Sequence, residues 1–353
     1  MSDQVDMKQI LGLLVGGETL TESQAHDAFE CVMTGNATDA QIGALLTAIS
    51  CRPNNAGPSV DEIVGAATVM REHATKVSVP EGMDVIDTCG TGGDHSGTFN
   101  VSTVAALIAA GAGAKVAKHG NRSITSKSGS SQVLEALGVN LQITPDLQTK
   151  CLEEAGICFC FAPAHHPAMK HAIGPRQQLG FRTIFNVLGP LTNPAGAKRQ
   201  VMGVYSPTLT APIARVLQRM GSQRVMVVHG SGMDEITTVG STQISELKDG
   251  EVRTYNVTPE ELGLTRSSPD DLLADGVEDS AAVIRSILHG EQSHARNIAV
   301  VNAAAALVVA GVADSLAVGI QAASQSIDKG AAKQVLYKLV ELTTADANPV
   351  DLS

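Results

Sequence analysis

The segment Asp84–Ala110 reads DVIDTCGTGGDHSGTFNVSTVAALIAA and joins a short apolar run to an alanine-rich one. Between these runs Gly90, Gly92 and Gly93 occupy three of four positions, and an acid follows them. Glycine loses more conformational freedom on folding than any other residue, so a plain turn does not need this density. The pattern predicts a strand, a loop whose backbone something approaches closely, and a helix that begins near Asn100.

The same alternation of strand and helix continues along the chain after Pro80. Strands followed by helices imply crossover connections, and therefore a largely parallel sheet that is buried on both faces. Ligands of such sheets lie beyond the carboxyl ends of the strands, which is where the glycine loop falls. We expect strands in 84–88, 114–118, 157–161, 200–206 and 224–230, and helices in 102–110, 129–137, 208–220 and 280–345.

Residues 1–79 show only helical patterns. Three helix starts repeat a Ser or Thr cap with Glu or Gln three residues later, and the pairs are Thr21 and Gln24, Thr38 and Gln41, and Ser59 and Glu62. We therefore predict an α/β fold made of a small N-terminal all-helical domain, residues 1–79, and a larger α/β catalytic domain, residues 80–353, with a mainly parallel central sheet. Part of 165–200 is a candidate to pack on the helical domain.

Composition limits the partners of the chain. The 353 residues include 25 Lys and Arg against 36 Asp and Glu, for a net charge of −11, which argues against nucleic acid but allows a small anion in a local basic pocket. The apolar stretch 298–313 is too short and alanine-rich to span a bilayer, and the first residues lack the pattern of a signal peptide. Six scattered cysteines are typical of reduced thiols, so we expect a cytoplasmic protein without a membrane partner.

The glycine loop has the composition of a phosphate cradle. Glycines let successive N–H groups point into one concavity, and a helix that starts close by adds its own free N–H groups and dipole. A tight turn without a ligand is the alternative, and the loop alone does not decide between the two. Two familiar nucleotide motifs are excluded, because His95 stands where a Rossmann fingerprint needs its third glycine and no Gly-Lys-Ser/Thr follows.

Two further loops follow predicted strands and could share one site with the first. The segment 117–131, AKHGNRSITSKSGSS, places Lys118, His119, Arg122 and Lys127 among hydroxyl residues, which suits an anion, although a solvated loop has the same composition. In the segment 229–240, two adjacent acids, Asp234 and Glu235, follow a predicted strand. They could hold Mg²⁺ on a phosphate, or they could be ordinary surface residues.

The segment 161–194 offers histidines and two arginines. His165, His166 and His171 lack a nearby carboxylate or cysteine, so a zinc site is not favoured. Arg176 lies in a stretch poor in charge and is the candidate clamp for a substrate carboxylate. Arg182 could serve instead, or be a buried structural arginine.

Together these motifs resemble a known family. DTCGTGGD, NVST, KHGNRSITSKSG, HPAMKH…R…LGFRTIFNVLGPLTNP and GMDEIT come in the order and spacing of anthranilate phosphoribosyltransferase, over nearly the whole chain. The resemblance implies a nucleoside phosphorylase/phosphoribosyltransferase-like fold and transfer of the phosphoribosyl group of phosphoribosyl diphosphate to the amine of anthranilate, in tryptophan biosynthesis. It also implies a homodimer joined through the helical domain and two Mg²⁺ ions per active site.

The resemblance carries over sets of site residues. The phosphoribosyl diphosphate set is Gly90, Gly93, Asp94, Thr98, Asn100, Val101, Ser102, Thr103, Lys118, His119, Gly120, Asn121, Arg122, Ser123, Ile124, Thr125, Ser126 and Ser130. The anthranilate set is Gly90, His119, Asn121 and Arg176, and the metal set is Ser102, Asp234 and Glu235. No residue is assigned as a general base.

Two other functions fit parts of the pattern. A pyrimidine nucleoside phosphorylase has a similar architecture, but GTGGD, NVST and KHGNR together favour the transferase. A nucleic-acid-binding relative that kept only the fold is disfavoured by the net charge and by the complete phosphate motifs.

Overall fold

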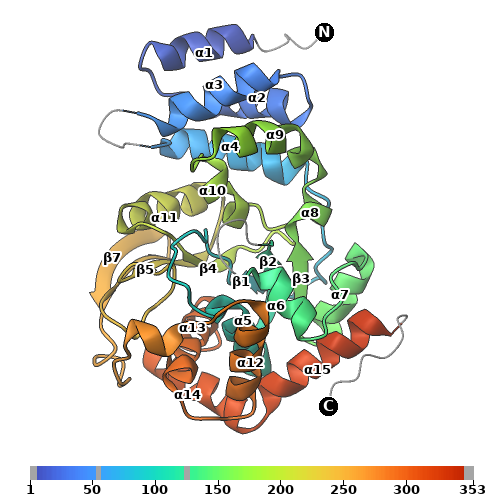
Figure 1. Cartoon of the computed structure of the whole chain (residues 1–353), viewed down its shortest axis with the longest axis vertical. Coiled ribbons are helices and arrows are strands. Elements are labelled where there is room, and N and C mark those ends of the chain that lie inside the picture. The colour runs from blue at the N-terminus through green and yellow to red at the C-terminus, as the bar shows by residue number, and fades with distance from the viewer. Residues whose placement is uncertain (1–5, 53–56, 123–127, 346–353) are drawn as a thin grey trace.

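The N-terminal quarter of the chain folds into four helices. The computed structural model describes residues 6–52, 57–122 and 128–345 (Figure 1). The three predicted capping boxes are confirmed: in each, the Ser or Thr side chain accepts from the third backbone N–H, and the Gln or Glu accepts from the cap N–H. The helices are α1 (Met7–Val15), α2 (Glu22–Met33), α3 (Asp39–Ser50) and α4 (Val60–Glu72).

A single sheet organises the rest, in the order β3-β2-β1-β4-β5-β6-β7. The five strands from β3 to β5 pair in parallel, which confirms the mainly parallel sheet. The antiparallel edge pair β6–β7 was not predicted, although Asp249-Gly250, with φ of 51° and 79°, is a typical hairpin turn. The strands are β1 (Val85–Asp87), β2 (Lys115–Gly120), β3 (Ile157–Phe161), β4 (Arg199–Gly203), β5 (Arg224–Gly230), β6 (Thr242–Lys248) and β7 (Glu251–Val257).

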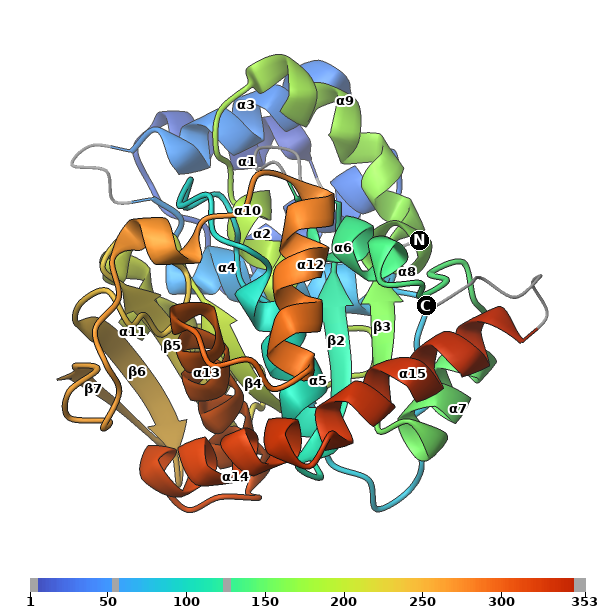
Figure 2. The same cartoon turned by 60° about the horizontal axis from the view of Figure 1, so that its bottom comes forward.

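Helices cover both faces of this sheet (Figure 2). In β5 the side chains alternate: Met226 and Val228 join the core under the C-terminal helices, whereas Val225 and Val227 join the core that contains the N-terminal helices. The remaining helices are α5 (Val101–Gly111), α6 (Ser130–Ala136), α7 (Pro145–Glu154), α8 (Ala162–His165), α9 (Lys170–Leu179), α10 (Phe185–Leu188), α11 (Thr210–Arg219), α12 (Val277–Leu288), α13 (His294–Ala310), α14 (Leu316–Asp328) and α15 (Ala331–Thr344).

The chain returns to the N-terminal helices after β3. Helix α9 packs on α2 and α3, and α10 packs on α4, so segments within 165–200 lie beside the helical part (Figure 1). The division of the chain between residues 79 and 80 stays a prediction. No helix among the described residues is both long and apolar enough to cross a membrane. All six cysteines are free.

Candidate functional site

The glycine loop runs from the end of β1 to the start of α5. Gly92 and Gly93 have φ of 63° and 73°, a region that residues with a Cβ rarely adopt, so the loop geometry itself favours glycine there. The Thr91 N–H donates to the Gly203 carbonyl at the end of β4 (2.9 Å), and the Ala274 N–H donates to the Gly97 carbonyl (3.0 Å). These bonds tie the loop to the rest of the domain at both ends.

Helix α5 begins where the loop ends, as predicted. Asn100 is its N-cap residue, and the side-chain amide of Asn100 donates to the Ser128 hydroxyl (3.3 Å). Burial raises the pKa of the nearby Glu235 carboxylate, and the Ser102 backbone at this helix end opposes that larger effect by lowering it. The free N–H groups of this helix end therefore already attract negative charge.

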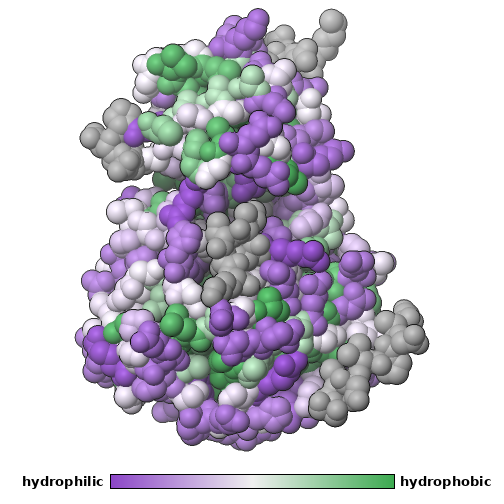
Figure 3. Space-filling model, viewed as in Figure 1, coloured by the Kyte–Doolittle hydropathy of each residue, from purple (hydrophilic) through white to green (hydrophobic). Residues whose placement is uncertain are grey.

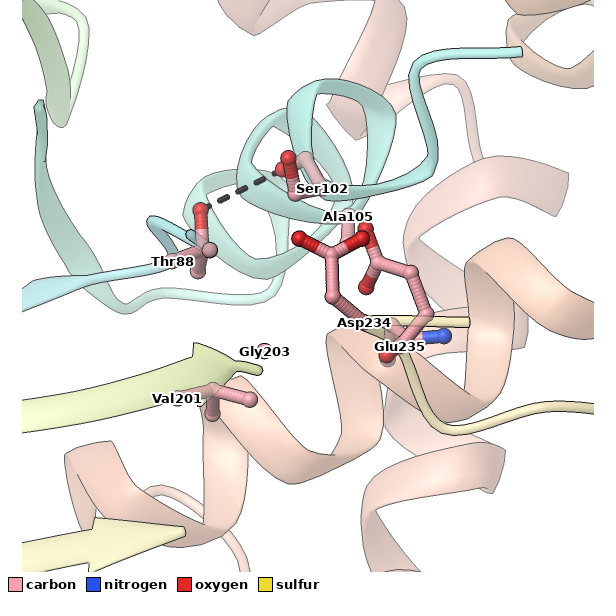
Figure 4. A pocket seen from close by; sticks show the side chains of 9 residues that line it. Thr88, Ser102, Ala105, Val201, Gly203, Asp234 and Glu235 are labelled. Carbon is pink, nitrogen blue, oxygen red and sulfur yellow. Dashed lines mark hydrogen bonds between the residues drawn. The ribbon is translucent and has the colours of Figure 1, made fainter. Parts of the chain in front are cut away.

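Three carboxylates meet at this point. Asp234 and Glu235 follow β5 and point toward Ser102 (Figure 4). The Asp234 carboxylate accepts from the Gly92 N–H (2.8 Å), and the Asp94 carboxylate accepts from the Asp234 N–H (3.3 Å). Burial and the neighbouring Asp94 raise the pKa of Asp234 to about 7, and burial and Asp234 raise the pKa of Glu235.

Such an arrangement fits a hard divalent cation. Neither Asp234 nor Glu235 forms an ion pair within the described ranges, and the nearby Ser102 adds a hydroxyl oxygen. Mg²⁺ prefers oxygen ligands and is usually held by one or two carboxylates together with substrate phosphates. The predicted metal set therefore lies together and is chemically suited to Mg²⁺.

Lys118 lies beneath the site. Its side chain is buried, and its ammonium donates to the Thr88 carbonyl (3.0 Å) and to the Ser102 hydroxyl (3.2 Å). A run of charged residues in the sequence does not show whether a lysine faces solvent or the core. In the structure, the Lys118 ammonium is buried and bonds to the first turn of α5. Its predicted contact with phosphoribosyl diphosphate stays a prediction.

His119 is buried, neutral and only partly bonded. Its Nδ1 is 3.1 Å from the Gly189 carbonyl, to which it donates, and its Nε2 has no partner within the described parts of the chain. Burial, then His166 and His165, lower the pKa of His119 to about 3. A neutral imidazole with a spare acceptor nitrogen suits a substrate N–H group.

Asp87 holds His119 in place. Its carboxylate accepts from the His119 backbone N–H (3.1 Å) and from the Asn193 amide (2.8 Å). Ligand atoms of Asp87, Cys89 and His119 lie within 4.8 Å of one another. Because Asp87 already accepts these bonds and the Lys118 ammonium is close, we assign no metal to this group.

The buried histidines should shape stability against pH. The unfolded state binds a proton on His119 below its ordinary pKa of about 6.5, which the folded state does not bind until about pH 3. His119 therefore removes stability as the pH falls from 6.5, by about 2 kcal/mol at pH 5, whereas the raised pKa values of Asp87 and Asp234 act in the opposite direction. We expect His119→Asn to change the free energy of unfolding less at pH 5 than at pH 7, by about 2 kcal/mol. Urea unfolding at both pH values measures this difference, and an identical effect at both would contradict the assignment of a neutral imidazole.

The second loop is described only in part. Ser123, Ile124, Thr125, Ser126 and Lys127 lie outside the described residues. Before them, the Asn121 carbonyl accepts from the Ser130 hydroxyl (3.4 Å), and Arg122 is exposed beside Glu135 (3.5 Å). Gly120 is needed for close packing, because an added Cβ would lie 2.5 Å from the Ser130 oxygen.

Other predicted residues flank the glycine loop. Thr98 bridges to Leu273, which pins the loop against the segment before α12. Val101 is buried in the core, and the Thr103 hydroxyl donates to the Asn100 side chain (3.3 Å). These residues shape the helix start, and their contact with a ligand stays a prediction.

The two candidate arginines differ in their surroundings. The guanidinium of Arg176, on α9, stacks on the Phe185 ring at 4.9 Å and makes no hydrogen bond or ion pair with any described residue. Arg182 is exposed, so the buried alternative was wrong; it donates to the Gly93 carbonyl and stacks on the Tyr205 ring at 4.4 Å. Arg176 is therefore the arginine that is available for a carboxylate.

Sequence reasoning missed a glycine that the site requires. An added Cβ on Gly203 would lie 1.5 Å from the Asp234 carbonyl oxygen. The backbone that carries the Asp234 and Glu235 carboxylates therefore crosses directly over the end of β4. The signal was a glycine inside the predicted strand 200–206, where glycine often marks a close backbone approach.

The fold and this site define a glycosyl transferase. Residues 82–333 match a family model described as the a/b domain of a glycosyl transferase family, and residues 8–74 match its helical bundle domain. Anthranilate phosphoribosyltransferases of Paramagnetospirillum magneticum and Acetivibrio thermocellus are 51% and 50% identical to the chain, over 96% of it and 96% and 97% of their own lengths. The chain belongs to the anthranilate phosphoribosyltransferase family.

Solved structures agree with this assignment. The anthranilate phosphoribosyltransferase of Thermus thermophilus superposes with a TM-score of 0.89 at 40% identity, covering 95% of this chain and 99% of that one. The Saccharomyces cerevisiae enzyme in complex with PRPP and Mg gives 0.86 at 26% identity, covering 96% and 98%. The resemblance and the fold class drawn from the sequence are thus confirmed.

Proposed function

We propose that this chain transfers the phosphoribosyl group of phosphoribosyl diphosphate to the amine of anthranilate, giving N-(5-phosphoribosyl)anthranilate and diphosphate, in tryptophan biosynthesis. The supporting observation is the glycine loop at the start of α5, which faces the Asp234 and Glu235 carboxylates. Relatives of this name share about half of the residues over almost the full length.

The diphosphate half of the site is formed by backbone and carboxylates. Loop N–H groups around Gly93 and the first turn of α5 would bind the diphosphate oxygens. Ser102, Asp234 and Glu235 would hold Mg²⁺, which neutralises the charge of the departing diphosphate, and we propose two ions per site. Lys118 keeps the Ser102 hydroxyl in place.

The acceptor half surrounds His119. We propose that Gly90, Asn121 and His119 contact anthranilate and that Arg176 binds its carboxylate. The amine of anthranilate is the nucleophile, so the protein mainly orients two substrates and excludes water. Attack opposite the departing diphosphate inverts the configuration at the ribosyl carbon.

The surface supports a homodimer. Val15 on α1 is 83% exposed and Ile173 on α9 is 46% exposed, and Figure 3 shows apolar side chains gathered over this end of the molecule. We propose that the helical part, residues 1–79, associates with a second copy through this end.

The cellular location is a separate proposal. Six free thiols support a reducing, cytoplasmic location.

One assay tests the proposed reaction. Anthranilate fluorescence should disappear only when both phosphoribosyl diphosphate and Mg²⁺ are present, and a chelator should stop the loss. Phosphorolysis of thymidine, with no use of anthranilate, would instead make the chain a pyrimidine nucleoside phosphorylase. A gel shift with nucleic acid at modest salt would support the binding-protein alternative.

A further inference from the structure

Helix α13 contains one buried amide in an otherwise apolar stretch. From Ile298 to Ala310 every residue other than Asn302 is Ala, Val, Ile or Leu, and Asn302 is 3% exposed. Burying an amide is unfavourable unless its hydrogen bonds are made. We therefore expect the Asn302 amide to make specific hydrogen bonds. Apolar packing of the helix alone does not explain an asparagine at this position.

The Asn302 amide forms hydrogen bonds with Ile236, the residue that follows Asp234 and Glu235. Its Oδ1 accepts from the Ile236 N–H (2.9 Å), and its Nδ2 donates to the Ile236 carbonyl (2.8 Å). The Nδ2 also donates to the Ile298 carbonyl one turn earlier in α13 (2.8 Å), which fixes the side chain against its own helix. Both backbone polar groups of Ile236 are thus held as they would be by a neighbouring strand.

Two glycines lie directly against the same backbone. An added Cβ would lie 1.5 Å from the Asp234 carbonyl oxygen at Gly203 and 2.5 Å from the Glu235 carbonyl oxygen at Gly230. The carboxylate-bearing backbone therefore rests on the glycine ends of β4 and β5. These are steric contacts without hydrogen bonds, so the hydrogen bonds of Asn302 to Ile236 add a directional constraint that they lack.

We propose that Asn302 is a positioning residue that fixes Asp234 and Glu235 in the orientation that Mg²⁺ binding requires. This inference rests on the proposed metal role of the two carboxylates. Asn302 lines the same pocket as both of them, so its removal acts directly where the carboxylates meet Ser102. Two like-charged, partly buried groups repel each other, and a rigid backbone keeps them close enough to share a cation.

The test compares two substitutions with a matched control. Asn302→Ala removes every bond of the amide, whereas Asn302→Asp keeps an acceptor for the Ile236 N–H and loses the donor. Ser326→Ala serves as the control, because Ser326 is a buried residue of α14 whose hydroxyl donates to the Ile108 carbonyl (2.9 Å). This bond does not involve the segment 231–240, which carries Asp234 and Glu235.

Three measurements follow on the full-length protein. Hydrogen exchange of the amides in 231–240 without metal should be about tenfold faster in Asn302→Ala, with partial protection in Asn302→Asp. Mn²⁺ affinity, measured by electron paramagnetic resonance with phosphoribosyl diphosphate present, should fall about 10- to 100-fold, as for other residues that orient metal ligands. The half-saturating Mg²⁺ concentration should rise by a similar factor, while the KM for anthranilate should stay within about twofold.

The outcomes separate this inference from the proposed function. If both Asn302 variants match Ser326→Ala in exchange and in Mn²⁺ affinity, Asn302 is only a packing residue and the inference is overturned. If Asn302→Ala does not fold, the Asn302→Asp variant decides by the same comparison. A wild-type protein that does not consume anthranilate would overturn the proposed function, while hydrogen exchange of 231–240 would still show whether Asn302 anchors the loop.

Discussion

Replacing Asp234 by Asn and Glu235 by Gln should lower turnover by at least about a thousandfold, because the amides cannot neutralise a bound divalent cation. The loss corresponds to several kcal/mol of charge stabilisation for the departing diphosphate. High Mg²⁺ should restore part of the rate, since the substrate phosphates still supply ligands. Initial rates measured over a wide Mg²⁺ range test this expectation.

A second acidic pair provides the control. Glu153 and Glu154 are adjacent, exposed acids on α7, and changing them to Gln removes the same formal charge. This control variant should keep normal turnover and normal metal dependence. A doubly changed Asp234 and Glu235 enzyme with wild-type activity would refute their assignment as metal ligands.

The KM for anthranilate should rise about ten- to a hundredfold in Arg176→Ala and less in Arg176→Lys. A planar guanidinium matches a carboxylate with two parallel hydrogen bonds, whereas lysine keeps the charge and loses that geometry. The Arg176 side chain has no hydrogen-bond or ion-pair partner among the described residues, so its substitution breaks no such internal contact. The KM for phosphoribosyl diphosphate should hardly change.

Arg182→Ala is the comparison for this result. The Arg182 side chain donates a hydrogen bond to the Gly93 carbonyl, so its loss should loosen the glycine loop. The binding of phosphoribosyl diphosphate should therefore weaken, whereas the binding of anthranilate should not. If Arg176→Ala left anthranilate saturation unaltered while Arg182→Ala shifted it, the carboxylate clamp would be Arg182. The acceptor half of the proposed function would then need revision, and the phosphate half would not.

Features that arise from local sequence were predictable. A capping box needs only two residues three positions apart, and all three predicted boxes formed. The strand–glycine–helix pattern likewise placed the loop at the start of α5, because each element depends on neighbouring residues. The hairpin that carries β6 and β7 had an Asp249-Gly250 signal of the same local kind, and the prediction overlooked it.

Features that arise from packing were not predictable in this way. The sequence places Lys118 among hydroxyl residues, but only the fold shows that it is buried under the Ser102 hydroxyl. Arg182 could not be distinguished from a buried arginine, because its contact with Gly93 joins segments far apart in the chain. The contact between Asn302 and Ile236 was not predicted, because a single amide in an apolar helix does not indicate its distant partner.

The two cores on either side of the sheet bear on how this protein could be divided. Val225 and Val227 of β5 bury their side chains in the same core as Phe29 of α2 and Val69 of α4. A cut between residues 79 and 80 would therefore open this core where α4 packs on α10 and α11, leaving an exposed apolar face on each fragment. The predicted boundary along the chain thus crosses an apolar contact in the folded molecule, and a shortened enzyme or a domain exchange within this family would need to keep α4, α10 and α11 together.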